Sequence, residues 1–367
     1  MVRQLASEVG ITIDGRLPWD LRVHDRRFYQ RVLTDGSLGL GESYMEGWWD
    51  CDDLVELHCL IARGDAESRI RPSWRVLWHA GKARLVDLQS RRRAAIVARS
   101  HYDVTVDHYS AMTDPWRTMS CGYWKDATTL AEAQEAKLDL VCRKLGLSAQ
   151  DRVLDIGCGL GSLARYAATK YGCSVVGISI AGEQVRTLRD LCADLPVTVH
   201  HCDYRDVEIF AKDGPFDKIV SLEMFEHVGV KNHRAYFEVA HGCLRPGGLF
   251  LLQTVGANVS SHRNDPWFDK YIFPNGVVPS VGQIGVAIEN LFVLEDWHNF
   301  GPDYVKTLSA WFENFDRHWP GSKGDAFYRM WKYYLLSAAG GFKARRRQIW
   351  QILLSKGTLP DVGPQER

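Results

Sequence analysis

The sequence has no excess of charge of either sign. Lysine and arginine together number 45, and aspartate and glutamate together also number 45, so the formal net charge is zero. A chain that binds nucleic acid over its surface normally carries a strong basic excess. The composition therefore argues against such binding, and we expect no nucleic-acid partner.

Long apolar runs are absent as well. No stretch of 18 or more consecutive apolar residues occurs, so no transmembrane helix is predicted. The chain does not open with the basic and apolar pattern of a secretory signal. We expect a cytoplasmic protein that meets a membrane only peripherally, at its inner face.

Paired cysteine motifs are missing too. The nine cysteines are an odd number and include no CxxC pair, which is typical of reduced thiols in a cytoplasmic protein. No metal site is expected.

Tryptophan, by contrast, is abundant, with 13 residues. Aromatic rings suit an apolar or a cationic ligand.

Residues 1–80 are predicted to form a small N-terminal α/β domain, because they lack the glycine-rich turn that appears later. The patterns predict a short strand and turn at 10–15, helices at 28–33 and 53–62, and a loop crowded by Gly36, Gly39 and Gly41. Trp48 and Trp49 are expected in its core.

Residues 81–100 are predicted to form a basic linker compatible with a helix. Its charged residues are Lys82, Arg84, Arg91, Arg92, Arg93 and Arg99. Such a run is either a solvated face or a surface attracted to anionic lipid headgroups.

Residues 101–367 are predicted to form one α/β domain. A helix at 129–145 begins with the capping-box pattern Thr129-Leu-Ala-Glu132 and stops at Gly146. Strands and helices then alternate, which is typical of a doubly wound parallel sheet covered on both faces. The predicted strands are 152–156, 174–179, 197–202, 217–222 and 249–255, with 292–300 and 347–354 closing the sheet; the predicted helices are 161–171, 181–193 and 231–244.

The most informative stretch is Val153-Leu-Asp-Ile-Gly-Cys-Gly-Leu-Gly161. A buried strand runs into three glycines, and a helical pattern follows at once. Glycines allow a ligand close to the backbone, and a helix N-terminus offers unpaired N–H groups. The spacing does not fit the GxGxxG of dinucleotide sites, and the acid, Asp155, precedes the glycines. The Asp-x-Gly-x-Gly spacing instead resembles the S-adenosylmethionine site of class I methyltransferases, which implies that Asp155 and the turn face that cofactor.

Longer sequence segments narrow the resemblance to one family of such methyltransferases. Nearly end to end, the chain resembles bacterial cyclopropane-fatty-acyl-phospholipid synthases, in the segments Gly36-Ser-Leu-Gly-Leu-Gly-Glu-Ser-Tyr-Met-Glu-Gly-Trp-Trp-Asp50, Met119-Ser-Cys-Gly-Tyr-Trp124, Met224-Phe-Glu-His-Val-Gly229, Lys270-Tyr-Ile-Phe-Pro-Asn-Gly276 and Glu295-Asp-Trp-His-Asn-Phe-Gly301. The resemblance implies the class I methyltransferase fold, with a mostly parallel seven-stranded sheet and a small N-terminal domain associated with lipid and dimer contacts. It also implies a homodimer that acts on unsaturated phospholipid at the membrane surface.

The implied reaction transfers a methylene from S-adenosylmethionine to a cis double bond of an acyl chain. A cyclopropane ring forms through a carbocation that bound bicarbonate deprotonates. By motif position, the implied catalytic residues are Cys121, Glu226, Gln253 and Tyr304. The implied cofactor residues, besides Asp155, are Ser120, Gly157, Gly159, Ser179, Gln184, Asp203 and Tyr204.

One position departs from the family pattern inside the implied active site. The family string Leu-Leu-His-Thr reads Leu251-Leu-Gln-Thr254 here. A glutamine still forms hydrogen bonds, but it does not gain a proton near pH 7. Bicarbonate would bind more weakly, or the proton step would differ.

Alternatives therefore stay open for the product and for single residues. The chain is either a cyclopropane synthase, a C-methyltransferase that gives a methyl or methylene branch on a lipid or specialised metabolite, or a lipid-binding protein without catalysis. Cys121 also suits a core position, Glu226 a helix cap and Tyr304 a surface position.

Overall fold

The structure is a computed structural model that describes residues 1–65, 111–212, 214–319, 321 and 324–357. Its contacts divide the chain into two compact units. The first contains the described residues of Met1–Asp87, Ser261–Gly276 and Gly301–Gln348, and the second those of Leu88–Ser260, Val277–Phe300 and Ile349–Arg367. This division differs from the predicted one, because two later segments belong with the N-terminal unit. The predicted basic linker lies outside the described residues.

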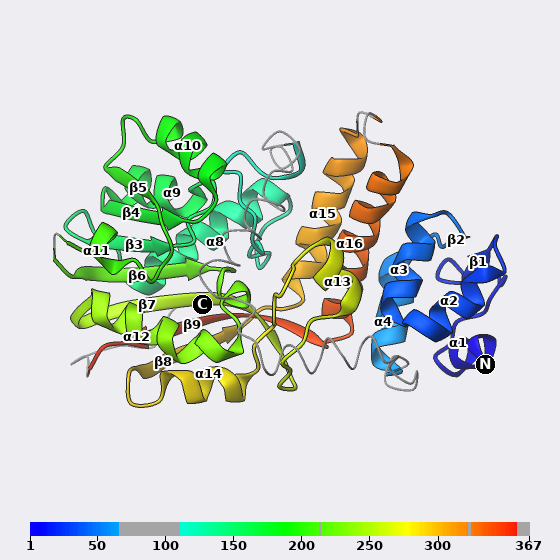
Figure 1. The fold of residues 1–367 in the computed structure, drawn as a ribbon. Helices are drawn as coiled ribbons and strands as arrows, with labels where there is room; N and C mark the ends of the chain where they lie inside the picture. The colour runs from blue at the N-terminus through cyan, green and yellow to red at the C-terminus, as the bar shows by residue number, and fades with distance from the viewer. Residues whose placement is uncertain (66–110, 213, 320, 322–323, 358–367) are drawn as a thin grey trace. The chain divides into compact units, whose positions relative to one another are not determined.

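The first unit is mainly helical (Figure 1). Its described elements are α1 (Val2–Glu8), β1 (Arg22–Val23), α2 (Arg27–Asp35), α3 (Ser37–Met45), β2 (Trp49–Asp50), α4 (Leu54–Arg63), α13 (Pro266–Tyr271), α15 (Asp303–Arg317) and α16 (Asp325–Lys343). β1 and β2 pair antiparallel. The helices predicted at 28–33 and 53–62 are confirmed as α2 and α4.

Aromatic packing explains why segments far apart in sequence share the first unit. Trp49 and Trp267 are both fully buried. The ring of Tyr333 lies 4.6 Å from that of Trp267 and 6.5 Å from that of Trp49. Trp49 is thus a core residue, as predicted, whereas Trp48 is half-buried and lies under the guanidinium of Arg27 at 4.5 Å.

Two predictions for the first unit are wrong. Gly39 and Gly41 lie inside α3, not in a loop. A Cβ at Gly39 would approach the Arg31 carbonyl oxygen to 2.4 Å, and one at Gly41 would approach Trp267 Cδ1 to 2.3 Å. These glycines therefore serve close packing within a helix. The strand predicted at 10–15 is only an isolated bridge between Ile13 and Leu21, which leaves no regular strand there.

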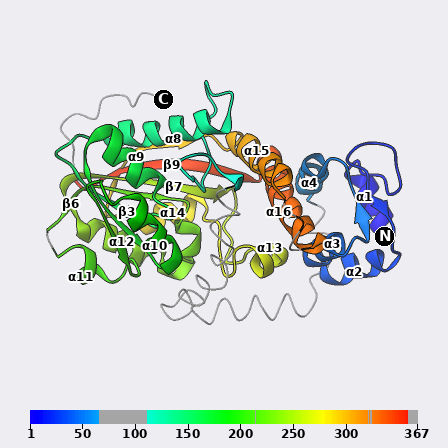
Figure 2. The same ribbon diagram turned by 90° about the horizontal axis from the view of Figure 1, so that it is seen from above.

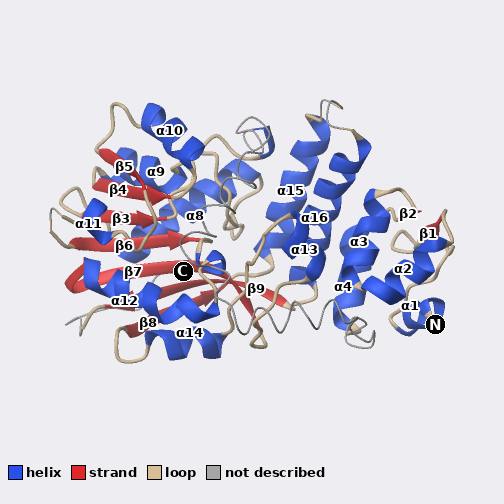
Figure 3. Cartoon of the chain, in the orientation of Figure 1, coloured by secondary structure: helices blue, strands red, loops and turns tan. Residues whose placement is uncertain are grey.

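The second unit is built on one seven-stranded sheet in the order β5-β4-β3-β6-β7-β9-β8 (Figure 3). β5, β4, β3, β6 and β7 pair in parallel, and β8 is antiparallel to β9. This arrangement confirms the predicted fold class, including the two closing strands. The strands are β3 (Arg152–Ile156), β4 (Ser174–Ser179), β5 (Val197–His201), β6 (Phe216–Leu222), β7 (Leu244–Ala257), β8 (Val293–Asn299) and β9 (Arg347–Ser355).

Helices cover both faces of this sheet (Figure 2). Phe250 of β7 packs in a buried cluster with Phe237 of α12, and the next residue, Leu251, packs with Leu138 of α8 on the other side. Successive strand residues thus point into two separate cores. The described helices are α8 (Leu130–Leu145), α9 (Ser162–Tyr171), α10 (Gly182–Leu191), α11 (Val207–Phe210), η2 (Phe225–His227), η3 (Val230–Asn232), α12 (His233–Cys243) and α14 (Val281–Ile288).

Two smaller predictions are also confirmed, for the ends of α8 and for the cysteines. Thr129 and Glu132 form the capping box of α8, and Gly146 ends the helix in the left-handed conformation. All nine cysteines are buried free thiols. Within the described ranges, no helix is long and apolar enough to cross a bilayer.

A buried ion pair fixes α8 against β8. Lys144 Nζ lies 3.0 Å from Asp296 Oδ2 and 3.2 Å from His298 Nδ1, and the Lys144 side chain is 1% exposed. The neighbouring Arg143 pairs with Asp139 at 2.8 Å, but both side chains are more than a third exposed. The two adjacent pairs allow a matched comparison of buried and exposed charge.

Replacing Lys144 should destabilise the second unit far more than replacing Arg143. Lys144→Met keeps the apolar stem but removes the cation that pairs with the buried Asp296, and breaking a buried pair in this way costs about 3–5 kcal/mol. Arg143→Met should cost less than about 1 kcal/mol, since exposed pairs contribute little. Urea unfolding followed by circular dichroism measures both, and equal losses would contradict the assignment.

Candidate active site

The three glycines after β3 form a turn, and the structure gives a separate reason for glycine at each position. Gly157, Gly159 and Gly161 have φ values of +83°, +54° and +73°, which disfavour other residues. A Cβ at Gly157 would meet Met224 Cγ at 2.5 Å, and one at Gly161 would meet Leu188 Cδ1 at 2.0 Å. A Cβ at Gly159 would meet nothing within 4 Å. The backbone of Gly159 therefore faces open space at the N-terminus of α9.

Asp155 precedes this turn as a buried acceptor. Its residue is 3% exposed, and no described residue forms a hydrogen bond with its carboxyl group. Burial raises the pKa of this group to about 7, partly offset by the charge of Lys137. A buried acid in this state favours a cationic ligand group, such as the ammonium of a methionine moiety.

The other predicted cofactor residues follow the neighbouring strands β4 and β5. Ser179 Oγ accepts a hydrogen bond from the Ala181 N–H at 3.2 Å. Gln184 is buried in the first turn of α10. Asp203 pairs with Arg205 at 2.7 Å, and these residues line up with the glycine turn along the carboxyl edge of the sheet. Open α/β sheets bind ligands at this edge.

Tyr204 and Ser120 complete the predicted cofactor set. Tyr204 follows Asp203, and its ring packs edge-on against Tyr236 at 5.2 Å. Ser120 lies before α8, and its hydroxyl accepts a hydrogen bond from Lys137 Nζ at 2.8 Å. The backbone carbonyl of Ser120 accepts a second bond from Gln134 Nε2 at 2.7 Å. Ser120 is thus bound to α8 through both its hydroxyl and its backbone carbonyl.

The predicted catalytic residues Cys121 and Gln253 meet at a residue that was not predicted, Glu223. Glu223 Oε1 accepts a hydrogen bond from the Cys121 backbone N–H at 2.8 Å and another from Gln253 Nε2 at 2.8 Å. Gln253 is fully buried, and its Oε1 accepts from Gln351 Nε2 at 3.0 Å. The Cys121 thiol points elsewhere and donates to the Gly122 carbonyl at 3.2 Å.

Glu226, three residues after Glu223, is a second acid at the same edge. Its Oε1 accepts a hydrogen bond from the Val255 N–H. The residue is only half-buried as a whole, but Oε2 is sealed from solvent and has no hydrogen-bond partner among the described residues. Burial, and then the charge of Glu223, raise the pKa of Glu226 to about 8. At pH 7 Glu226 is therefore mostly a neutral acid, not a base.

The remaining predicted catalytic residue, Tyr304, belongs to the first unit. It lies in the first turn of α15 and is 6% exposed. Its ring packs 4.6 Å from Phe342 and 6.0 Å from Trp311. Tyr304 is thus a buried residue and not a surface one, and its catalytic part stays a prediction.

Sequence reasoning missed Lys137, Gln134 and Glu223. Lys137 is fully buried, and burial lowers its pKa to about 8 against the opposing effect of Glu223. Polar residues three apart on the buried face of α8 are a signal that the sequence offered. The position of Glu223 is a second such signal, since an acid directly follows the apolar strand β6.

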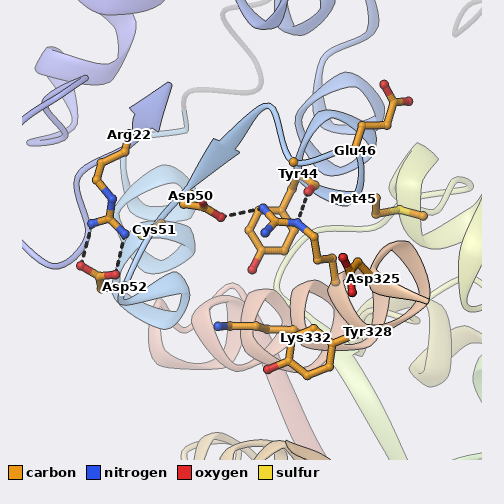
Figure 4. Close-up of a pocket in the computed structure, with 12 residues that line it drawn as sticks. Arg22, Tyr44, Met45, Glu46, Asp50, Cys51, Asp52, Asp325, Tyr328 and Lys332 are labelled. Atoms are coloured by element: carbon orange, nitrogen blue, oxygen red, sulfur yellow. Dashed lines mark hydrogen bonds and ion pairs between the residues drawn. The ribbon is translucent and has the colours of Figure 1, made fainter. Parts of the chain in front are cut away.

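A separate hollow of about 550 Å³ lies within the first unit (Figure 4). Its charged residues mostly satisfy one another: Arg22 binds Asp52 through two hydrogen bonds of 2.6 Å, and Arg329 binds Asp50 at 2.8 Å. None of the predicted site residues lines it. The chemistry-bearing groups gather instead on the sheet of the second unit.

Raising the pH from 6 to 9 should destabilise the wild type more than Glu226→Gln. The folded protein keeps a proton on Glu226 up to about pH 8, whereas the unfolded chain releases it near pH 4.5. Stability therefore falls as the pH rises between these values, by at most about 1.4 kcal/mol per pH unit, and glutamine removes this loss. Urea midpoints at both pH values test it, with the exposed Glu208→Gln as control. A pH-independent difference would contradict the assignment.

Comparison with known proteins identifies the family of this chain. The family model described as "Mycolic acid cyclopropane synthetase" matches residues 89–352. The cyclopropane-fatty-acyl-phospholipid synthase of Escherichia coli (strain K12) is 48% identical, over 97% of this chain and 93% of the relative. The tuberculostearic acid methyltransferase UfaA1 of Mycobacterium tuberculosis is 30% identical, over 90% of this chain and 82% of the relative.

A solved structure is similar as well. The cyclopropane synthase MmaA2 from Mycobacterium tuberculosis is 29% identical with a TM-score of 0.66, over 74% of this chain and all of that one. A family model that matches well over half of the chain, and a relative 48% identical along nearly all of it, show that this chain belongs to the mycolic acid cyclopropane synthetase family.

Proposed function

We propose that this chain transfers a methylene from S-adenosylmethionine to a cis double bond of an unsaturated phospholipid acyl chain, which forms a cyclopropane ring. The observation that carries the proposal is the 48% identity, along 97% of the chain, to a cyclopropane-fatty-acyl-phospholipid synthase. The glycine turn and the acids at the carboxyl edge of the sheet support it, because they supply a cofactor cradle and proton-handling groups in one place.

The residues present fit S-adenosylmethionine. Gly159 leaves open space where a side chain would stand, and Asp155 is a buried acceptor without a hydrogen bond from the described residues. When bound, the cofactor supplies an electrophilic methyl on a sulfonium. Asp155 and the glycine turn would hold its methionine and ribose parts. Ser120, Ser179, Gln184, Asp203 and Tyr204 would hold the rest, as the resemblance implies.

The site must also place a weak nucleophile and then remove a proton. An alkene reacts only when it is held within near-attack distance of the methyl group. Methyl transfer leaves a cation on the acyl chain, and loss of a proton from the added methyl closes the ring. By resemblance, Cys121, Glu226, Gln253 and Tyr304 would hold a bicarbonate for this step. That bicarbonate stays a prediction.

A second candidate is C-methylation without ring closure. A probable fatty acid methyltransferase of Pseudomonas putida is 34% identical over 89% of this chain. The glutamine at position 253 is the residue of this chain that favours a changed proton step. The two candidates share the cofactor and the alkene, and they differ in the fate of the cation that methyl transfer leaves.

We further propose that the protein acts as a homodimer, peripherally, at the inner face of the membrane. The homodimer is what the family resemblance implies. The support for the membrane location is chemical, since an acyl chain of a bilayer lipid must reach the cofactor site from the membrane surface. The basic residues between 82 and 99 suit anionic headgroups, although they lie outside the described residues.

Incubation with S-adenosylmethionine and vesicles rich in monounsaturated phospholipid should add one CH2 per acyl chain and consume the double bond. The ring follows from loss of the methyl proton, and proton NMR identifies ring protons directly, next to mass spectrometry of the acyl chains. Vesicles of saturated lipid are the control. A methyl or methylene branch without ring protons would refute cyclopropane formation and keep methyl transfer.

Binding to vesicles should increase with the fraction of anionic lipid and decrease with salt. Basic residues contribute about 1 kcal/mol each near such a surface, and salt screens this attraction. Sedimentation with vesicles that contain none, a fifth or half anionic lipid measures the effect. Binding that is indifferent to both lipid charge and salt would count against the membrane-surface proposal.

A further inference from the structure

We propose that Lys137 and Ser120 together bind the carboxylate of the methionine part of S-adenosylmethionine. The proposal rests on the proposed function and deepens it. The sequence patterns gave Lys137 no role, and they gave Ser120 only a general place among the residues that hold the cofactor.

Lys137 is a buried cation that the protein itself satisfies only in part. Its side chain is fully buried in the middle of α8. An ammonium carries three N–H donors, and among the described residues Lys137 forms a hydrogen bond only with Ser120 Oγ, at 2.8 Å. A buried charge is costly unless it is paired and hydrogen-bonded. Two donors of Lys137 therefore remain for a bound group.

The hydroxyl of Ser120 is a donor that lacks its acceptor. A hydroxyl has one O–H donor and two acceptor lone pairs, whereas an ammonium only donates. Ser120 Oγ therefore accepts from Lys137, and its own O–H proton has no acceptor among the described residues. Ser120 is 4% exposed, so it is withdrawn from bulk water. An O–H donor beside a cation suits an anionic acceptor.

The Ser120 segment is fixed at the carboxyl edge of the sheet. Gln134, three residues before Lys137 on α8, donates from Nε2 to the Ser120 backbone carbonyl at 2.7 Å. The backbone N–H of Cys121 donates to Glu223 Oε1 at 2.8 Å. Glu223 directly follows β6, which is the parallel neighbour of β3. The two donors are thus held in place at the edge where the glycine turn after β3 lies, so little ordering is needed when a ligand binds.

Asp155 supplies the opposite charge close to Lys137. Burial raises the pKa of Asp155 to about 7, and the charge of Lys137 acts against this shift, so the two side chains lie within electrostatic reach of each other. An α-amino acid carries its ammonium and its carboxylate on one carbon, and a site for both needs an acid and a base near each other. The methionine part of the cofactor is such a group, whereas its adenosine is uncharged. Asp155 therefore suits the ammonium, and Lys137 with Ser120 suits the carboxylate.

A second buried lysine on the same helix shows how a purely structural cation is satisfied. Lys144 lies two turns further along α8, and its ammonium pairs with Asp296 at 3.0 Å. Lys137 forms no such ion pair with a described residue. The contrast indicates that the counter-charge of Lys137 comes from a ligand.

Calorimetry with S-adenosylmethionine and its decarboxylated form tests the proposal, because the decarboxylated form lacks the carboxylate and keeps the ammonium. The full-length wild type should bind S-adenosylmethionine at least about 30-fold more tightly, since leaving one partner of a buried charge pair alone is costly. Lys137→Met keeps the apolar stem without the charge. It should lose most of this preference and bind the decarboxylated form within about threefold of the wild type. Ser120→Ala removes one hydrogen bond to a charged group and should lose about 10-fold of the preference.

Controls separate ligand binding from folding. Glu135→Gln, on the exposed side of α8, should keep the wild-type preference. A Lys137→Met that weakens both ligands equally, or a wild type without a preference, would overturn the proposal. If Lys137→Met does not fold, Ser120→Ala decides, and a Ser120→Ala with the full wild-type preference contradicts the proposal. A wild type that binds neither ligand would instead refute S-adenosylmethionine as the cofactor, and with it the proposed function.

Discussion

Hydrogen bonds that converge on the Glu223 carboxyl group hold the reactive edge of the second unit together. The segment before α8 contributes the Cys121 N–H, and β7 contributes the Gln253 amide. β9 takes part through Gln351, which orients Gln253. Cys121 lies 102 residues from Glu223 in sequence, so one acceptor fixes segments that local structure alone would leave independent.

Low polarity around this edge decides the charge of its other groups. Burial lowers the pKa of Lys137 to about 8 and raises those of Asp155 and Glu226 to about 7 and about 8. The pKa of each buried group is thus shifted toward physiological pH, because an isolated charge is costly in such surroundings. Positive charge brought in by a ligand would favour ionisation of the acids, and in return the acids would favour binding of that ligand. The site thus suits a sulfonium and an ammonium better than it suits a neutral or anionic nucleotide.

The sheet was predictable from sequence because strand patterns alternate with helical patterns, and because β3, β7 and β9 inside the sheet are largely buried. β3 and β4 match their predicted bounds, and most of the other strands differ by one or two residues. Gly39 and Gly41 were wrongly predicted to lie in a loop. They are glycines because Arg31 and Trp267, which belong to other helices, leave no room there for a side chain. The role of Glu223 was not predictable either. It depends on the register of β6 with β7 and on a distant loop, which no local pattern specifies.

The position of the base decides between a ring and a branch. After methyl transfer, loss of a proton from the added methyl closes the ring, whereas loss from a neighbouring chain carbon gives a branched alkene. Both fates follow from the same cation, so the geometry of the base relative to these protons selects between them. Glu223 stands at the end of a buried strand and is bound by donors from two other segments. Gln253 is one of these donors, so the residue that departs from the family pattern helps to fix the polar groups at this edge.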